Sequence, residues 1–112
     1  MADVSAEEST DQQDPITITH APERQRYELR DEGTLIGHLD YVVPDEGHVD
    51  VLHTEVDEAY GGRGLAGRLV AHALADVRAR GLRVIPHCPY VQEWLRRNTG
   101  YQDLVDWPHD RA

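Results

Sequence analysis

The sequence predicts a single mixed α/β domain over residues 15–107, and two features of its pattern carry that prediction. From Ile16 to Val56, apolar and polar residues alternate with the period of β-strands, and short polar turns interrupt the alternation. After Gly62 the apolar spacing becomes that of an amphipathic helix, and a short apolar strand follows. The pattern indicates an antiparallel meander that leads into a β-α-β unit. Because the chain has 112 residues, we expect one hydrophobic core and one active site.

The meander is predicted to contain four strands. The first two cover residues 16–20 and 24–30, and a turn at 31–33 leads to the third, over 34–43. Alternation in the third strand places four apolar side chains on one face: Leu35, Leu39, Tyr41 and Val43. After a turn at 44–47, the fourth strand, 48–56, presents two faces, one with Val49, Val51, His53 and Glu55 and the other with Leu52, Thr54 and Val56.

The helix after the meander has an apolar stripe of Leu65, Leu69, Ala73 and Val77, and Gly81 provides its stop signal. A strand at 82–85, a second helix at about 90–98 and a short strand within 101–107 are expected to complete the domain. Residues 1–14 are acidic and poor in apolar side chains, so we expect a flexible tail there. Residues 108–112 form a second tail.

Composition narrows the range of partners. The formal net charge of −10 argues against nucleic-acid and membrane binding and weakly favours a cationic or amine partner. All 11 basic residues are arginines, so the chain has no lysine for a Schiff base. Its one cysteine cannot form an internal disulfide.

Neither a signal peptide nor an apolar run of roughly 20 residues is present in the sequence, which suggests that the protein is cytoplasmic. The oligomeric state cannot be read from the sequence.

Three glycines, Gly61, Gly62 and Gly64, lie between the fourth strand and the first helix. Such a turn lets backbone N–H groups approach an anion, and a helix N-terminus adds positive charge. The alternative is a tight strand-to-helix connection with no ligand. The spacing matches neither the dinucleotide fingerprint nor the phosphate loop of nucleotide hydrolases.

At this point the chain resembles the GNAT superfamily of N-acetyltransferases, whose coenzyme A loop reads Gln/Arg-x-x-Gly-x-Gly/Ala. Gly64 and Ala66 match the fourth and sixth positions, whereas Gly61 replaces the Gln or Arg, a loss for which Arg63 or Arg68 could compensate. The resemblance covers residues 15–107, and within the superfamily the chain is most similar to the minimal single-domain subgroup. This resemblance implies splayed central strands, acetyl-CoA as co-substrate, and a cofactor site formed by Val56, Gly61, Gly62, Arg63, Gly64, Leu65, Ala66 and Arg68.

Four side chains are candidates for the chemistry. The family uses an acidic residue on the strand before the loop to relay the amine's proton, which points to Glu55 or His53, although both could simply belong to a polar sheet face. Cys88 precedes the last helix, where a thiolate is favoured, and could accept the acetyl group or be a buried packing residue. The tyrosine that many GNAT enzymes use as an acid aligns near Arg96, so Tyr90 or water would replace it.

The resemblance therefore implies an enzyme that transfers an acetyl group from acetyl-CoA to a primary amine, either of a small molecule or of a protein lysine. The alternative is a non-catalytic acyl-CoA-binding or interaction module on the same fold. His87 lies beside Cys88, but two adjacent ligands without a second pair are poor zinc spacing, so we expect no metal.

Overall fold

The computed structural model describes residues 15–108, so the predicted tail at 1–14 and most of the one at 108–112 lie outside the described residues. Five strands form one sheet in the order β1-β2-β3-β4-β5: β1 (Ile16–Ala21), β2 (Arg26–Asp31), β3 (Thr34–Asp45), β4 (His48–Val56) and β5 (Arg83–Pro86). The pairs from β1 to β4 are antiparallel, and β4 and β5 are parallel. The predicted meander and β-α-β unit are thereby confirmed.

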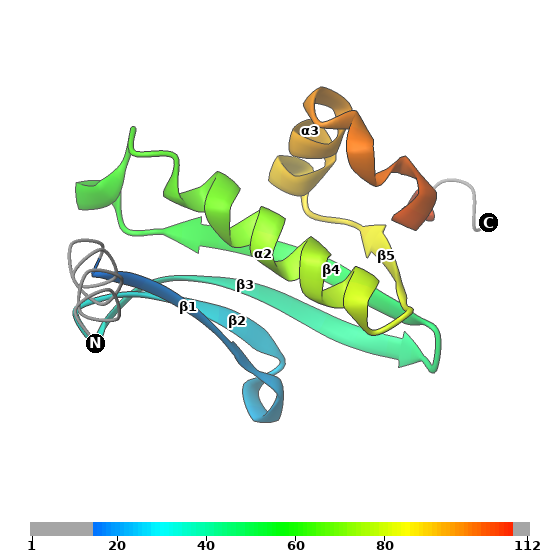
Figure 1. Cartoon of the computed structure of the whole chain (residues 1–112), viewed down its shortest axis with the longest axis horizontal. Coiled ribbons are helices and arrows are strands. Elements are labelled where there is room, and N and C mark those ends of the chain that lie inside the picture. The colour runs from blue at the N-terminus through cyan, green and yellow to red at the C-terminus, as the bar shows by residue number, and fades with distance from the viewer. Residues whose placement is uncertain (1–14, 109–112) are drawn as a thin grey trace, which may run out of the picture.

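Two α-helices, α2 (Leu65–Ala79) and α3 (Pro89–Arg97), supply the other half of the core. Figure 1 shows α2 crossing one face of the sheet, with α3 beside β5. The predicted stripe of α2 is buried, and Val91 and Leu95 of α3 belong to the same apolar cluster. Within residues 15–108, no helix combines the length and the apolar character needed to cross a bilayer.

The predicted faces of β3 are partly wrong. Leu35 is 39% exposed and Val43 is 52% exposed, whereas Ile36 is buried. The pairing of β2 with β3 shifts between Leu29 and Arg30, because Leu29 is opposite Gly37 while Arg30 is opposite Leu35. This bulge inserts Ile36 as an extra residue and turns it toward the core in place of Leu35.

A second shift changes the faces of β4. Asp40 is opposite His53, whereas the next residue, Tyr41, is opposite Val51, so Leu52 is the extra residue of a bulge. Before the bulge Val49 and Val51 enter the core, and after it His53 is exposed. The prediction that His53 and Glu55 share a face with Val49 and Val51 is therefore wrong, although His53 and Glu55 do share one with each other.

The segment after α3 is not the expected strand. Thr99–Leu104 is a 3-10 helix, and only Val105 pairs, in a single bridge with Val84. The side-chain amide of Gln102 donates to the carbonyl oxygen of Leu95, so the segment folds back on α3 instead of extending along the sheet.

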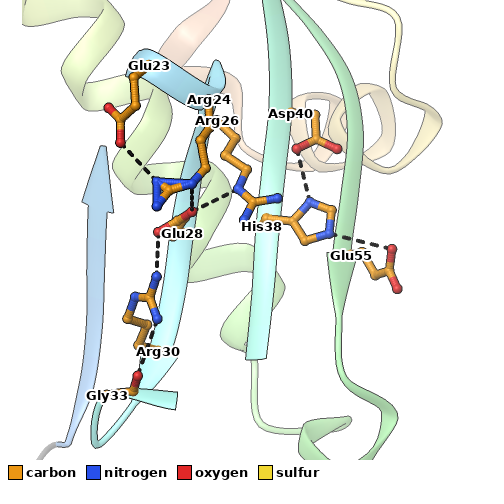
Figure 2. A network of polar contacts seen from close by, with 9 residues as sticks. All are labelled: Glu23, Arg24, Arg26, Glu28, Arg30, Gly33, His38, Asp40 and Glu55. Carbon is orange, nitrogen blue, oxygen red and sulfur yellow. Dashed lines mark hydrogen bonds and ion pairs between the residues drawn. The ribbon is translucent and has the colours of Figure 1, made fainter. Parts of the chain in front are cut away.

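The sheet face away from α2 is polar, as Figure 2 shows for β2, β3 and β4. At its centre Glu28 is only 3% exposed, and it accepts hydrogen bonds from Arg30 (2.7 Å) and Arg26 (2.9 Å). These bonds, that from Arg30 first, hold the pKa of Glu28 below its usual value.

A polar junction joins the far end of α2 to the sheet. The ring of His20 stacks on Tyr27, and its Nε2 lies 2.5 Å from the hydroxyl of Tyr41. Arg80 donates to Nδ1 of His20 over 2.6 Å, which requires the neutral ring. Burial, followed by the charge of Arg80, lowers the pKa of His20.

Candidate functional site

A gap opens between β4 and β5, as the resemblance implied. The two strands pair only from His48 to Val51, where Val51 lies opposite Pro86. The carbonyl oxygen of Val51 accepts hydrogen bonds from the backbone N–H groups of His87 (3.0 Å) and Cys88 (2.9 Å), and the chain then turns into α3. Because β4 continues to Val56, its edge beyond Val51 borders this gap and is available to pair with a ligand's amide.

The glycine-rich loop closes one end of the gap. Asp57 accepts a hydrogen bond from the N–H of Ala59 and so starts a short 3-10 helix, Glu58–Tyr60. Gly62 and Gly64 then adopt φ of +80° and +73°, a left-handed backbone that favours glycine. A Cβ at either position would meet no atom within 4 Å, so the space above both glycines is open.

Among residues 15–108, no side chain caps the N-terminus of α2. Gly64 is its N-cap residue, and no acidic residue lies in its first turn. The N–H groups of the first turn lack acceptors within the helix, and the helix dipole adds positive charge at this end. Unbonded N–H groups together with the positive end of the helix dipole suit a phosphate group. The residues of this helix end therefore fit the pyrophosphate of coenzyme A.

A cavity of about 180 Å³ lies at this point. It is lined by Val56, Tyr60, Gly61, Gly62, Gly64, Leu65, Ala66 and Tyr90. Six of the eight residues expected to hold the cofactor are among them. Arg63 and Arg68 are not: the guanidinium of Arg63 lies over the ring of Tyr60, 5.2 Å from its centroid, and Arg68 lies in the first turn of α2.

Tyr60 also lines this cavity. Its hydroxyl donates to Asp31 over 2.5 Å, and this bond raises the pKa of Tyr60 and fixes the ring beside the loop. Tyr60 begins the segment 60–66 that the sequence predicts to cradle the cofactor's phosphates.

Helix α3 meets α2 beside the cavity. A Cβ at Gly67 would lie 3.3 Å from Nε1 of Trp94 and 3.8 Å from the hydroxyl oxygen of Tyr90. The absence of a side chain at Gly67 thus lets α3 approach closely and brings Tyr90 to the cavity. Tyr90 is 38% exposed, so its hydroxyl is not committed to the core.

The four catalytic candidates fall into separate places. Tyr90 lines the cavity at the loop. Cys88 is 3% exposed, and its Sγ lies 3.5 Å from Oγ1 of Thr54 on β4. His53 and Glu55 lie together on the polar sheet face, with Nε2 3.2 Å from Oε1 and both side chains largely exposed. The structure therefore brings His53 and Glu55 together, but it does not gather all four residues.

Another cavity, of about 480 Å³, adjoins the first at Val56, and we call it the β3–β4 cavity. It is lined by Leu35, Ile36, Gly37, His38, Glu55, Val56, Asp57 and Glu58. His38 was not foreseen as a site residue. Its Nδ1 lies 3.0 Å from Oδ1 of Asp40, and Figure 2 shows both side chains beside Glu55. The spacing of His38 and Asp40 by two residues on a strand could have revealed the pair.

Comparison with known proteins agrees with this geometry. A family model described as GCN5-related N-acetyl-transferase matches residues 26–104. The chain belongs to this family. It is 31% identical to Protein NATD1 of Mus musculus over 103 residues, which are 88% of this chain and 90% of that protein. It is 34% identical to Protein NATD1 of Bos taurus over 89 residues, 75% of each chain.

Solved structures show the same fold. A GCN5-like protein from Staphylococcus aureus, determined by NMR, has a TM-score of 0.66 at 21% identity and matches 83% of this chain and 90% of its own. A GNAT family acetyltransferase from Brucella melitensis, solved in complex with acetyl-CoA, has a TM-score of 0.51 at 22% identity and matches 65% of this chain and 50% of its own. The GNAT-like fold expected from the sequence is confirmed.

Proposed function

We propose that the chain transfers an acetyl group from acetyl-CoA to a primary amine. The observation that carries this proposal is the uncapped N-terminus of α2, which faces open space above Gly62 and Gly64 beside the gap between β4 and β5. The cofactor site would comprise Val56, Gly61, Gly62, Gly64, Leu65 and Ala66, with Tyr60 added. Acetyl-CoA supplies an activated thioester, whose acetyl carbon the amine nitrogen attacks directly to form an amide.

In this proposal, each part of the site has a separate role in binding or catalysis. The N–H groups in the first turn of α2 bind the phosphates, and Arg63 and Arg68 contribute positive charge around the loop. Backbone groups of β4 near Val56 orient the chain that enters the gap and donate to the developing oxyanion. Tyr90, whose ring lines the cavity, protonates the departing sulfur. On the other side of β4, Glu55 attracts the ammonium form of the acceptor.

Coenzyme A binding is the first test. Because several backbone donors converge on one anion, we expect micromolar affinity, and ligand at about 100 times the dissociation constant should stabilise folding by about 2.7 kcal/mol. A thermal melt that does not move in millimolar coenzyme A would remove the central claim.

Release of free thiol from acetyl-CoA then separates enzyme from binding module. Amine-dependent release, with the acetylated amine found by mass spectrometry, supports the transferase. Tight binding of coenzyme A without release for any amine in a broad panel would favour the non-catalytic module. Such a panel also decides between small amines and lysine-containing peptides.

A further inference from the structure

The β3–β4 cavity has a position that suits an acceptor. It shares Val56 with the cavity at the glycine-rich loop, so the two spaces adjoin at the end of β4. Its volume of about 480 Å³ falls in the range of small-molecule sites. A ligand in this cavity would therefore lie next to the proposed cofactor at Val56.

The charges around the cavity favour a cation. Glu55, Asp57 and Glu58 all line it. Arg26, on the neighbouring strand β2, directs its Nε to Glu28 at 2.9 Å and shares that carboxylate with Arg30, and neither arginine lines the cavity. The summed field of three carboxylates raises the local concentration of positively charged ligands. Two of these carboxylates, on Asp57 and Glu58, lie beyond the end of β4 and leave room for a second positive charge.

His38 is placed to take a proton inside this cavity. An ionised carboxylate only accepts hydrogen bonds, so the contact with Asp40 places a proton on Nδ1 of His38, and in the neutral ring Nε2 then carries the lone pair. Nε2 lies 3.7 Å from Oε1 of Glu55, which is too long for a hydrogen bond. The other groups that face this ring are His53 on β4 and, across from β2, Arg26 and Glu28. His53 bonds to Glu55 but does not line the cavity.

We propose that the β3–β4 cavity binds the acceptor as a small aliphatic amine with a second positive charge, and that His38 takes the proton of its reacting nitrogen. This inference rests on the proposed function. The ammonium group gives one proton to Nε2 of His38 and becomes a neutral amine. As the amide forms, the carbon–sulfur bond breaks, Tyr90 gives its proton to the departing sulfur, which leaves as a thiol, and Tyr90 regains a proton from the nitrogen. His38 then returns its proton to water, and Asp40 acts as a positioning residue.

Two amines of matched length test the charge requirement. We expect a lower KM for 1,4-diaminobutane than for butylamine, because only the diamine has a second ammonium group for Asp57 and Glu58. Glu58→Gln should reduce this preference by about threefold to fivefold, the upper range for an exposed ion pair. Glu93→Gln, which removes an exposed carboxylate from α3, is the control and should change nothing. Equal KM values for the two amines in the parent would overturn the proposal.

Chemical rescue tests His38. His38→Ala should lower kcat about 100-fold or more, the usual contribution of a general base, and added imidazole should restore part of the rate. His72→Ala is the control, because it removes an exposed histidine ring from α2 that lines neither cavity, and it should keep its rate. Asp40→Asn should lower kcat without changing the KM of the diamine. Full turnover in His38→Ala would refute the role of this ring.

Binding can also be read without turnover. With coenzyme A present, 1,4-diaminobutane should shift the amide NMR signals of cavity residues such as Gly37 and Glu55 more than butylamine does, and Glu58→Gln should weaken the effect. Shifts spread over the acidic surface, or none at all, would overturn the proposal. A melt of the parent that does not respond to coenzyme A would instead defeat the proposed function, so the two failures are distinguishable.

Discussion

Thr54 and Cys88 face one another across the opening between β4 and β5, with Sγ of Cys88 3.5 Å from Oγ1 of Thr54. The cysteine is almost fully buried and its backbone N–H donates to Val51, so both its side chain and its main chain are held. A thiol in this setting contributes to packing where the sheet divides. Its burial favours direct attack by the amine over transfer of the acetyl group through Cys88.

We therefore expect Cys88→Ala to retain turnover close to that of the parent, measured as free thiol released from acetyl-CoA. The parent, incubated with acetyl-CoA and no amine, should show no acetyl adduct in its intact mass. An adduct on the peptide that contains Cys88, combined with loss of turnover in Cys88→Ala, would establish the cysteine as a covalent relay.

The backbone at Gly64 makes a sharper test of the phosphate loop. Asparagine tolerates the left-handed conformation, so Gly64→Asn should fold while its side chain occupies the space above the loop. Each lost bond to a charged phosphate costs about 1.5–3 kcal/mol, so calorimetry should show affinity for coenzyme A reduced at least about tenfold. Gly81→Asn changes a glycine with φ of +72° at the other end of α2 and should bind normally. Unchanged affinity in Gly64→Asn would rule out this loop as the phosphate site.

A branched side chain at the same position is less informative. The openness around Gly64 suggests that valine would disturb binding alone, but the positive φ adds backbone strain of about 1–2 kcal/mol. Gly64→Val should therefore lose stability as well as affinity, and circular dichroism during thermal unfolding would show the lower midpoint.

Tyr90 should separate binding from catalysis. Tyr90→Phe keeps the ring that lines the cavity, so affinity for coenzyme A should be unchanged, while kcat should fall about 100-fold if the hydroxyl is the acid for the sulfur. Steady-state kinetics with the best amine of the panel measures this difference. Tyr101→Phe removes another tyrosine hydroxyl, outside the cavity, and should leave kcat intact. A normal kcat in Tyr90→Phe would assign the proton transfer to water.

His20 should make stability depend on pH. Its pKa is lowered in the folded chain, so the unfolded chain takes up a proton more readily. The contribution of the neutral ring is fully present above the unfolded pKa of about 6.5 and is lost as pH falls below it through the lowered folded value. Urea unfolding at pH 7.5 and 5.5 should show this loss, and His20→Gln should flatten the slope over that interval. An unchanged slope would mean that the contact with Arg80 has no energetic role.

We expect the negative charge of Glu28 to stabilise the folded protein. Glu28→Gln leaves two arginine hydrogen bonds without a carboxylate and should cost about 1–3 kcal/mol at neutral pH. Because the pKa of Glu28 is lowered, its contribution is present above about pH 4.3 and disappears as pH falls, so parent and variant should converge in acid. Glu23→Gln, in an exposed pair with Arg24, is the control and should change stability by less than about 0.5 kcal/mol.

Local sequence pattern located the five strands of the sheet and both described α-helices, but it wrongly predicted a strand within 101–107 and it did not determine the faces of β3 and β4. The change of period after Gly62 and the stop at Gly81 located α2, and alternation located β1 to β4. The bulges at Ile36 and Leu52 reverse alternation, and neither residue differs in type from its neighbours in a strand. A bulge depends on pairing with another strand, so a single strand's pattern does not contain it.

The same reasoning explains which site residues were found. The glycines and Ala66 were predictable because their backbone role leaves a mark in residue type. His38 and Asp40 were missed although their spacing by two residues places them on one face of β3, because the pattern of one strand does not show which face borders a cavity. Tyr90 was predicted as a stand-in acid, and its place in the cavity depends on Gly67, which no motif identified.

The close contact between Gly67 and Trp94 gives the molecule an internal optical reporter. Trp94 lies beside Gly67 in the first turn of α2, and this turn directly follows the glycine-rich loop. The centroid of the Trp94 ring is 5.3 Å from that of Tyr101. The only other tryptophan, Trp107, lies under Arg96, away from the loop cavity. In a Trp107→Phe chain the emission of Trp94 alone would therefore follow any displacement of α2 against α3, and a change in its wavelength or intensity would record filling of the loop in real time.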